Sequence, residues 1–220
     1  MTNEFIREVD EEYRRDRVMQ IWSRFSGVII AVAILIVAAV GGWRYWQHVE
    51  RSRAEAAALR YSEALNLDRE GKASDAEKVL EDLARQDSGG YRALAKLRLA
   101  SLLAQRDPAE GEKAFTALAS DGELKPVLQD YARLRGAMIT LDRDPAAAQA
   151  PLERLASETN PWRHSARELL GLAALKRGDF DAASKWFDAI AADRETPSGL
   201  RGRLEIYTAL AAGGPVQVTQ

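Results

Sequence analysis

The side chains that could carry out catalysis or bind metal are few in this sequence and stand far apart. The chain has no cysteine and two histidines, His48 and His164. Without cysteine there is no thiol nucleophile, no disulfide and no thiolate ligand for zinc. Two histidines more than a hundred residues apart do not form the imidazole cluster of a metal site. The sequence therefore predicts no metal centre.

The remaining catalytic templates also fail. Gly89-Gly90 and Gly213-Gly214 are isolated pairs, whereas a phosphate-binding loop needs several glycines at fixed spacing before a helix. His164 stands at an expected helix start, where a capping or surface role is more common than that of a base. Adjacent carboxylates such as Glu81 and Asp82 fall on solvated helix faces. We therefore predict no catalytic residue, no cofactor and no enzymatic activity.

Composition indicates a helical protein with an appendage. Its 220 residues correspond to one folded domain plus an extra segment, at roughly 100–200 residues per domain. Lysine and arginine total 31 against 33 acidic residues, so the formal net charge is −2. A nucleic-acid-binding surface is usually basic, and this balance disfavours one. Abundant alanine and few aromatic residues, 7% of the chain, favour helices.

Residues 25–43 form an uncharged apolar segment bounded by Arg24 and Arg44. Its 19 residues match the length that a helix needs to cross about 30 Å of hydrocarbon. Trp22 and Trp43 flank it, as in interfacial aromatic belts. A buried core helix is rarely apolar on every face, and a cleaved signal peptide has a shorter apolar core. We therefore expect an uncleaved transmembrane helix over residues 25–43.

The segment before this stretch, residues 1–24, is charged and amphipathic. Phe5, Val9 and Tyr13 recur at i, i+4 and i+8, which places them on one face of a short helix. This helix is either a solvated lead-in to the anchor or a docking surface for a cytoplasmic partner. Five arginines precede the apolar segment and four follow it within about 20 residues. The positive-inside rule thus slightly favours a cytoplasmic N-terminus.

The clearest internal pattern after the apolar segment lies in residues 169–187. A Leu170-Gly171 pair is followed by a Gly178-Asp179-Phe180 turn, and then by Ala183 and Phe187. The pattern resembles the tetratricopeptide repeat, a helix–turn–helix unit of about 34 residues. We expect Gly171 and Ala183 to face each other where the two helices come closest, with Phe187 filling the remaining space.

The same turn recurs along the chain. Its positions 71, 107, 144 and 178 are separated by 36, 37 and 34 residues. A regular period of this length predicts an all-α fold, a tetratricopeptide-like helical solenoid. We assign residues 44–212 to this repeat domain, which closes with an amphipathic helix over residues 200–210. Residues 213–220 begin with Gly-Gly-Pro, and we expect a disordered tail there.

A solenoid of helix pairs presents a concave surface built from the first helix of each unit, and such surfaces bind peptides or partner helices. The side chains that we expect on this surface come from the first and fourth units: Tyr61, Leu65, Glu168, Leu172 and Lys176. They are the predicted partner-binding residues.

The layout resembles one family, the ancillary subunit of the SecYEG translocon, a single-span bacterial inner-membrane protein with a periplasmic tetratricopeptide-like domain. The likeness is carried by residues 5–12, by the run Gly42-Trp43-Arg44-Tyr45-Trp46, by the alanine-rich stretch 54–65 and by the repeat 169–187. It implies a cytoplasmic N-terminus and a periplasmic repeat domain. It also implies association with the translocon and with a membrane-anchored periplasmic chaperone of the prolyl isomerase-like type.

The function predicted on this basis is that of a non-enzymatic adaptor in the inner membrane. It would associate with the Sec translocon and help the periplasmic handling or chaperoning of exported polypeptides. Two alternatives share the architecture. One is a scaffold for envelope assembly or cell division, and the other is the membrane anchor of an enzyme subunit.

Overall fold

The computed structural model describes residues 2–85 and 89–213, with side chains for residues 26–28, 30–85 and 89–213. Within these residues every regular element is a helix. The chain divides into two compact units at Ala56 and Ala57. The predicted amphipathic face of residues 1–24 lies outside the described side chains. Of the predicted disordered tail, residues 213–220, the first residue is instead the last of helix α9 (Ser198–Gly213), and residues 214–220 lie outside the described part of the chain.

Helix α1 extends from Thr2 to Arg69. Its residues up to Ala56 form the first unit, and the rest of the helix belongs to the second unit. The described side chains from Ser26 to Ala56 are not buried, and the apolar ones are open along the helix, such as Leu35 at 69% and Val37 at 72% exposed. By length and composition this helix can cross a membrane. Trp43 and Trp46 contact each other near the end of the apolar run, with ring centroids 5.6 Å apart.

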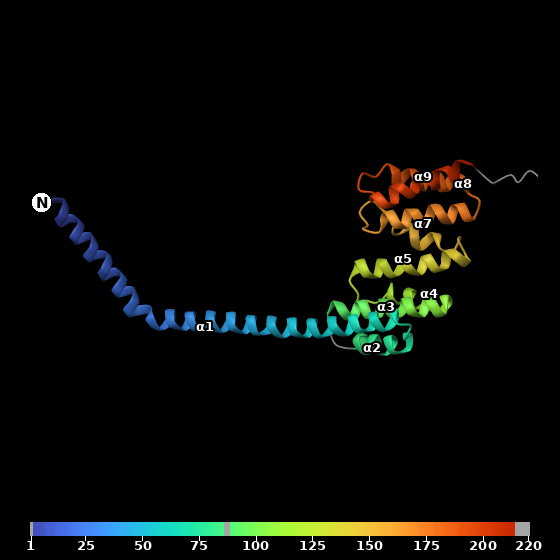
Figure 1. Cartoon of the computed structure of the whole chain (residues 1–220). Coiled ribbons are helices and arrows are strands. Elements are labelled where there is room, and N and C mark those ends of the chain that lie inside the picture. Colours follow the sequence, from blue (N-terminus) through green and yellow to red (C-terminus); the bar gives the residue numbers. More distant parts are fainter. Residues whose placement is uncertain (1, 86–88, 214–220) are drawn as a thin grey trace, which may run out of the picture. The chain divides into compact units, whose positions relative to one another are not determined.

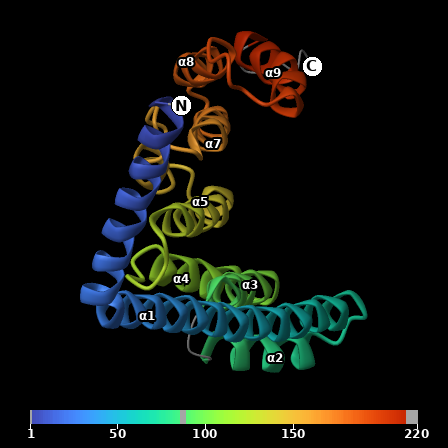
Figure 2. The same ribbon diagram turned by 90° about the vertical axis from the view of Figure 1, so that its left-hand side faces the viewer.

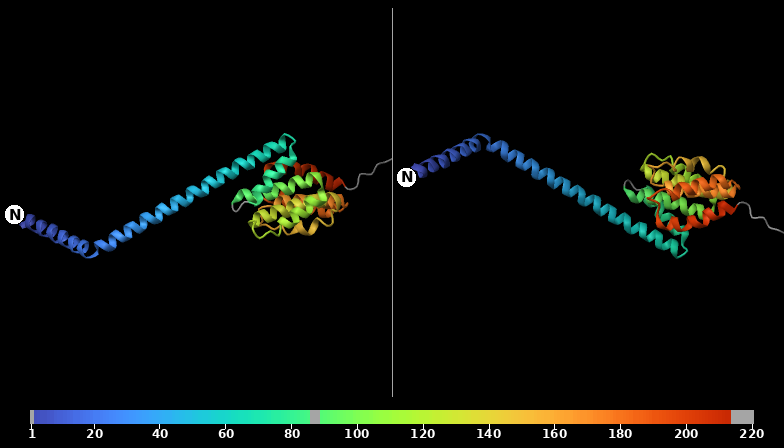
Figure 3. Two further views of the ribbon diagram at one scale, coloured as in Figure 1. Left: turned by 90° about the horizontal axis from the view of Figure 1, so that it is seen from below. Right: turned by 90° about the horizontal axis from the view of Figure 1, so that it is seen from above.

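The second unit is built from the last residues of α1 and the helices that follow. In chain order each of these helices packs against the next, so that helix pairs lie in successive layers (Figure 1, Figure 2). Figure 3 shows the same stack from below and from above. The helices after α1 are α2 (Ala73–Arg85), α3 (Gly90–Arg106), α4 (Pro108–Leu118), α5 (Pro126–Arg143), α6 (Gln149–Glu153), α7 (Arg163–Lys176), α8 (Phe180–Ala191) and α9 (Ser198–Gly213).

The four predicted turns are confirmed, and they use two local devices. Gly71 and Gly178 adopt positive φ values of 77° and 74°, a conformation that glycine reaches without a steric cost. At the other two turns an aspartate caps the next segment. Asp107 accepts hydrogen bonds from the amides of Ala109 and Glu110, and Asp144 accepts them from the amides of the second and third residues after it.

The third unit departs from the predicted regular helix pair. Its second helix, α6, has five residues, and turns precede and follow it. Pro151 lies inside this helix and removes one backbone donor, and Asn160-Pro161 ends the segment a few residues later. The unit still contributes to the core, because the side chains of Leu152 and Leu155 are buried.

Close helix crossings require glycine at two positions. A Cβ atom added to Gly111 of α4 would lie 2.3 Å from the backbone Cα of Ala104 in α3. A Cβ added to Gly171 of α7 would lie 2.3 Å from Cε1 of Phe187 in α8. The ring of Phe187 thus lies over the glycine, in agreement with its predicted place between the helices. Ala183 is buried in the same cluster as Phe187, and its position opposite Gly171 remains a prediction.

An ion-pair motif fastens the loop that follows α4. Lys96 of α3 donates from Nζ to Asp121 Oδ2 and to Glu123 Oε2, both at 2.7 Å. The second oxygen of Asp121 accepts a hydrogen bond from the amide of Glu123 at 2.9 Å. The Lys96 hydrogen bond lowers the pKa of Asp121, and the Asp121 carboxylate in turn raises the pKa of Lys96. An Asp-x-Glu loop is thus held to the first helix of its own unit.

The same motif recurs after α8. Arg163 of α7 donates from Nε to Asp193 Oδ2 at 2.9 Å and pairs with Glu195, whose amide donates to Asp193 Oδ1. The Arg163 hydrogen bond lowers the pKa of Asp193 to about 2. His164, which we expected as a capping or surface residue, is instead buried here, with its Nδ1 3.3 Å from Thr196 Oγ1. Burial lowers its pKa, and the nearby Arg163 charge acts in the same direction.

Helix α9 closes the described part of the solenoid. Leu200, Leu204 and Ala211 are buried against α8, and Tyr207 stacks on Phe187 with ring centroids 5.3 Å apart. The polar side chains of Arg201, Arg203 and Glu205 on this helix are exposed. The helix therefore covers the apolar end of the stack with a surface that is partly charged, although Ile206 and Leu210 are exposed on it as well.

The close crossing of α3 and α4 predicts the effect of one methyl group. We expect Gly111→Ala to lower the free energy of unfolding by about 1–3 kcal/mol, because backbone atoms of Ala104 must move away. Gly202→Ala is the matched control, since nothing lies within 4 Å of its added Cβ. That substitution should be neutral or should stabilise by up to about 1 kcal/mol. Denaturant unfolding of the full chain in detergent, followed by circular dichroism, measures both. Equal stabilities for the two variants would contradict the crossing.

The depressed pKa of Asp193 predicts an acid-dependent loss of stability. Its charged form is favoured in the folded state, so its contribution is complete above a pH of about 4 and is lost as the pH falls through about 2. Asp193→Asn should therefore melt at a lower temperature than the parent at neutral pH, and the difference should narrow from pH about 4 to about 2. Asp188→Asn, at an exposed position of α8, controls for the loss of one charge. A difference that stays constant over this range would refute the ion-pair account.

Candidate functional site

The first helices of the repeats form a cleft of about 320 Å³ on the second unit. We call it the aromatic cleft. Its side chains come from the last turns of α1, from α3 and α5, and from the residue before α7. The lining residues are Tyr61, Leu94, Leu97, Arg98, Ser101, Leu128, Tyr131 and Trp162.

Two aromatic contacts shape the cleft. Tyr61 lies against Tyr91 with ring centroids 5.8 Å apart, and Tyr131 lies against Trp162 at 5.2 Å. The indole Nε1 of Trp162 donates a hydrogen bond to the carbonyl of Val127 at 2.9 Å, which fixes the ring plane. Rigid aromatic faces with one satisfied polar end suit the binding of apolar side chains, because little side-chain entropy is lost on contact.

The charged groups at the cleft are already engaged. Arg98 forms an ion pair with Asp68 of α1, and both side chains are largely covered. Burial raises the pKa of Tyr61, so its phenol is neutral at physiological pH and serves as a hydrogen-bonding group. The cleft therefore offers apolar surface with a few hydroxyl and indole groups. Such a lining can bind a peptide. Among the residues that line the cleft, no nucleophile lies beside a general base.

The structure separates the five predicted partner-binding residues. Tyr61 lines the aromatic cleft, whereas Leu65, one turn further along α1, is half-buried and outside its lining. Glu168 of α7 is 14% exposed and accepts hydrogen bonds from Arg203, at 2.9 and 3.0 Å, and from the Tyr207 hydroxyl. It connects α7 to α9. Its partner-binding role remains a prediction.

The other two predicted residues are on α7 as well. Leu172 is half-buried, and Lys176 is exposed and donates to Asp142 of α5 at 2.7 Å. Neither belongs to the aromatic cleft. Leu65 and Leu172 each stand six residues before a turn, at Gly71 and Gly178. The equivalent residues of the two middle units are Ser101, which lines the cleft, and Met138, which is 40% exposed.

Sequence reasoning missed the residues that α3 and α5 contribute. Leu94 and Tyr131 each stand thirteen residues before a turn aspartate, Asp107 and Asp144, respectively. This shared offset was readable from the sequence, because equivalent positions of successive first helices face the same side of a solenoid. Trp162 precedes α7 and had no such signal. Among the described residues, no three histidine or carboxylate side chains come together in a way that could hold a metal.

Comparison with known proteins agrees with this architecture. Residues 20–206 match the family described as tetratricopeptide repeat-like domain. The chain is 31% identical over 180 residues to the ancillary SecYEG translocon subunit of Escherichia coli strain K12, which covers 79% of this chain and 84% of that protein. No solved structure matches the chain. The sequence, the helix pairs and these matches together show that the chain belongs to the family of ancillary SecYEG translocon subunits with a tetratricopeptide repeat-like domain.

Proposed function

We propose that this protein is an adaptor of the bacterial inner membrane that associates with the Sec translocon and helps the periplasmic handling or chaperoning of exported proteins. The observation that carries the proposal is the likeness to the ancillary SecYEG translocon subunit, which extends over 79% of the chain and 84% of that relative. The match to the tetratricopeptide repeat-like family over residues 20–206 includes both the apolar helix and the repeats.

The aromatic cleft supplies a physical basis for handling polypeptides. An exported chain that is not yet folded exposes apolar and aromatic side chains, which pack favourably on aromatic faces. The cleft holds Tyr61, Tyr131 and Trp162 in fixed positions, and Leu94 is 39% exposed beside them. Because the cleft is small, one contact gives weak and reversible binding, which suits a protein that must release its client.

The membrane arrangement is part of the proposal. Residues 25–43 cross the inner membrane once, residues 1–24 are cytoplasmic, and residues 44–212 form the periplasmic repeat domain, followed by the tail 213–220. The partners are the SecYEG translocon, a membrane-anchored periplasmic chaperone of the prolyl isomerase-like type, and exported polypeptides. The membrane helix keeps the aromatic cleft near the place where such polypeptides emerge. The adaptor acts by binding and catalyses no reaction.

Site-specific photocrosslinking tests the partners. A photoreactive amino acid at Leu94, in the aromatic cleft, should crosslink exported polypeptides in cells that are actively secreting. The matched control is Lys185, exposed on α8 and away from the cleft, where we expect at least about tenfold less client product. Mass spectrometry of the products should also recover translocon subunits. Recovery of cell-division or envelope-assembly proteins without translocon subunits would contradict the proposal and favour the scaffold alternative.

Single-cysteine labelling tests the orientation, and the native chain contributes no cysteine of its own. A cysteine placed at Ser120, an exposed position after α4, should react with a membrane-impermeant maleimide in intact spheroplasts. A cysteine at Asn3 should react after the membrane has been permeabilised and not before. The reverse pattern would place the repeat domain in the cytoplasm and overturn this part of the proposal.

A further inference from the structure

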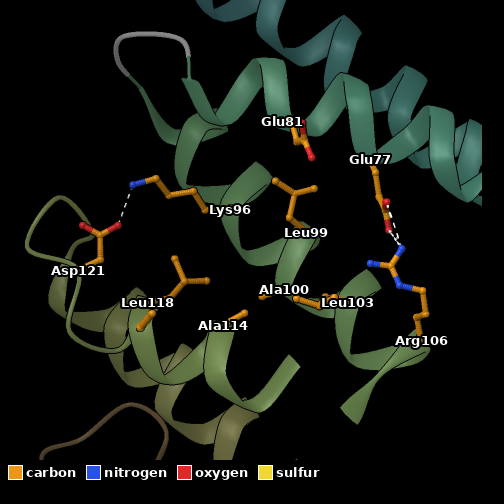
Figure 4. A pocket seen from close by; sticks show the side chains of 11 residues that line it. Glu77, Glu81, Lys96, Leu99, Ala100, Leu103, Arg106, Ala114, Leu118 and Asp121 are labelled. Atoms are coloured by element: carbon orange, nitrogen blue, oxygen red, sulfur yellow. Dashed lines mark hydrogen bonds and ion pairs between the residues drawn. The ribbon is translucent and has the colours of Figure 1, made fainter. Parts of the chain in front are cut away.

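A second and larger concavity, of about 550 Å³, is lined by other residues of α3 than the aromatic cleft. Figure 4 shows it from close by. It runs between α2 and α4, with α3 as its floor, and we call it the α2–α4 groove. Its lining residues are Glu77, Glu81, Lys96, Leu99, Ala100, Leu103, Arg106, Ala114, Ala117, Leu118 and Asp121.

The middle of the groove is apolar. Leu99 and Leu103 stand at i and i+4 on α3, and Leu118 projects from α4 toward the same space (Figure 4). All three leucines are half-buried, so each keeps part of its apolar surface in water. Ala114 and Ala117 supply small side chains on the α4 wall, which leave the space between the two walls unfilled. Covering this surface would be favourable by the hydrophobic effect.

Ion pairs mark both ends of the groove. Arg106 Nη1 lies 3.1 Å from Glu77 Oε1 at one end, and Lys96 pairs with Asp121 at the other (Figure 4). Lys96 and Arg106 are ten residues apart on α3, which corresponds to about 15 Å along a helix. An α-helix of about three turns has this length, and its apolar stripe at i, i+4 and i+7 fits between the two ends.

The charges of the lining favour a basic occupant. Three carboxylates and two cations line the groove. Both cations are neutralised inside it, Arg106 by Glu77 and Lys96 by Asp121. The third carboxylate, Glu81, is 52% exposed and pairs with Arg85, which is not part of the lining. The Glu81–Arg85 pair lies on the surface and contributes little, so the exposed Glu81 carboxylate on the α2 wall can also pair with a cation carried by an occupant (Figure 4).

We propose that the α2–α4 groove binds an amphipathic α-helix of a partner protein, about three turns long, with arginine or lysine beside its apolar stripe. The walls and floor are helices whose backbone groups are bonded within each helix, so an extended peptide would find no edge to pair with. A helix satisfies its own backbone and presents side chains alone. The inference goes beyond the proposed function and does not depend on it.

The test uses the full chain in phosphatidylcholine nanodiscs. The probe is a short fluorescein-labelled alanine-based peptide with leucine at i, i+4 and i+7 and arginine beside that stripe. Fluorescence anisotropy should show that the peptide binds the protein more strongly than it binds empty nanodiscs.

The charge on the α2 wall is tested by Glu81→Lys, which should weaken peptide binding about tenfold or more through like-charge repulsion. A peptide with glutamate in place of arginine should regain binding to this variant. Asp82→Lys is the matched control, with the same change in charge one residue along α2 and outside the lining, and should stay within about twofold of the parent.

A second pair of variants tests the apolar part. Ala117→Trp places a bulky ring in the groove from an exposed position and should abolish binding, whereas Lys185→Trp, at an exposed position of α8 outside the groove and the aromatic cleft, should leave it unchanged. Circular dichroism melting shows that each variant is folded. The proposal is overturned if the peptide does not bind the parent, if Glu81→Lys and Asp82→Lys behave alike, or if Lys185→Trp abolishes binding. It is also overturned if sedimentation shows that Ala117→Trp abolishes self-association, because the occupant would then be a second copy. None of these results bears on association with the translocon.

Discussion

The close contact between paired helices is the constraint on which the rest of the solenoid depends. At Gly111 a single added carbon would overlap the backbone of Ala104 in the paired helix, and at Gly171 it would overlap the Phe187 ring that fills the space between the two helices. Helices held at this distance behave as rigid pairs, because packed interiors resist small displacements. Space that the pairs do not fill must then appear between pairs, on the surface. The two concavities described above arise in this way. The aromatic cleft lies between successive first helices, and the α2–α4 groove between successive second helices.

The Asp-x-Glu loops set how one layer follows the next. In each loop the aspartate accepts a backbone hydrogen bond from the glutamate and a side-chain hydrogen bond from the first helix of the pair. Lys96 therefore has two effects. It fastens the loop that leads into α5, and it marks one end of the α2–α4 groove. In the fourth unit Arg163 takes over this role, with a guanidinium that reaches Asp193 and Glu195 together, while Arg167, at the position equivalent to Lys96, lies 3.4 Å from Asp193. Local electrostatics and the shape of the surface are thus linked through the same residues.

The fold could be predicted from the sequence where a residue pattern repeats along the chain. The prediction failed where the position of a side chain depends on one particular tertiary contact. The turns at Gly71 and Gly178 were visible because left-handed turns select glycine, and the apolar helix because lipid requires an uncharged stretch. The place of His164 was wrong, because its burial depends on one contact with the Thr196 hydroxyl, which lies 32 residues further along the chain and follows from no repeat. The short α6 follows from Pro151 and nearby turn residues, which a periodic alignment overlooks. The α2–α4 groove could not be predicted from the sequence, because it depends on the small side chains of Ala114 and Ala117, which belong to no sequence motif.

Helix α3 connects the two concavities. Leu94, Leu97 and Ser101 of this helix point into the aromatic cleft, and Leu99 and Leu103 line the groove. Residues two positions apart on a helix face nearly opposite directions, so one helix supplies both surfaces without sharing a side chain between them. An occupant of one surface therefore does not compete directly with an occupant of the other. Any influence between them must pass through the position of α3, which Gly111 of α4 and the Lys96 ion pairs hold fixed. Because these contacts restrain α3 from both ends, we expect the two surfaces to bind independently, so that a polypeptide in the cleft and a helix in the groove can be held at the same time.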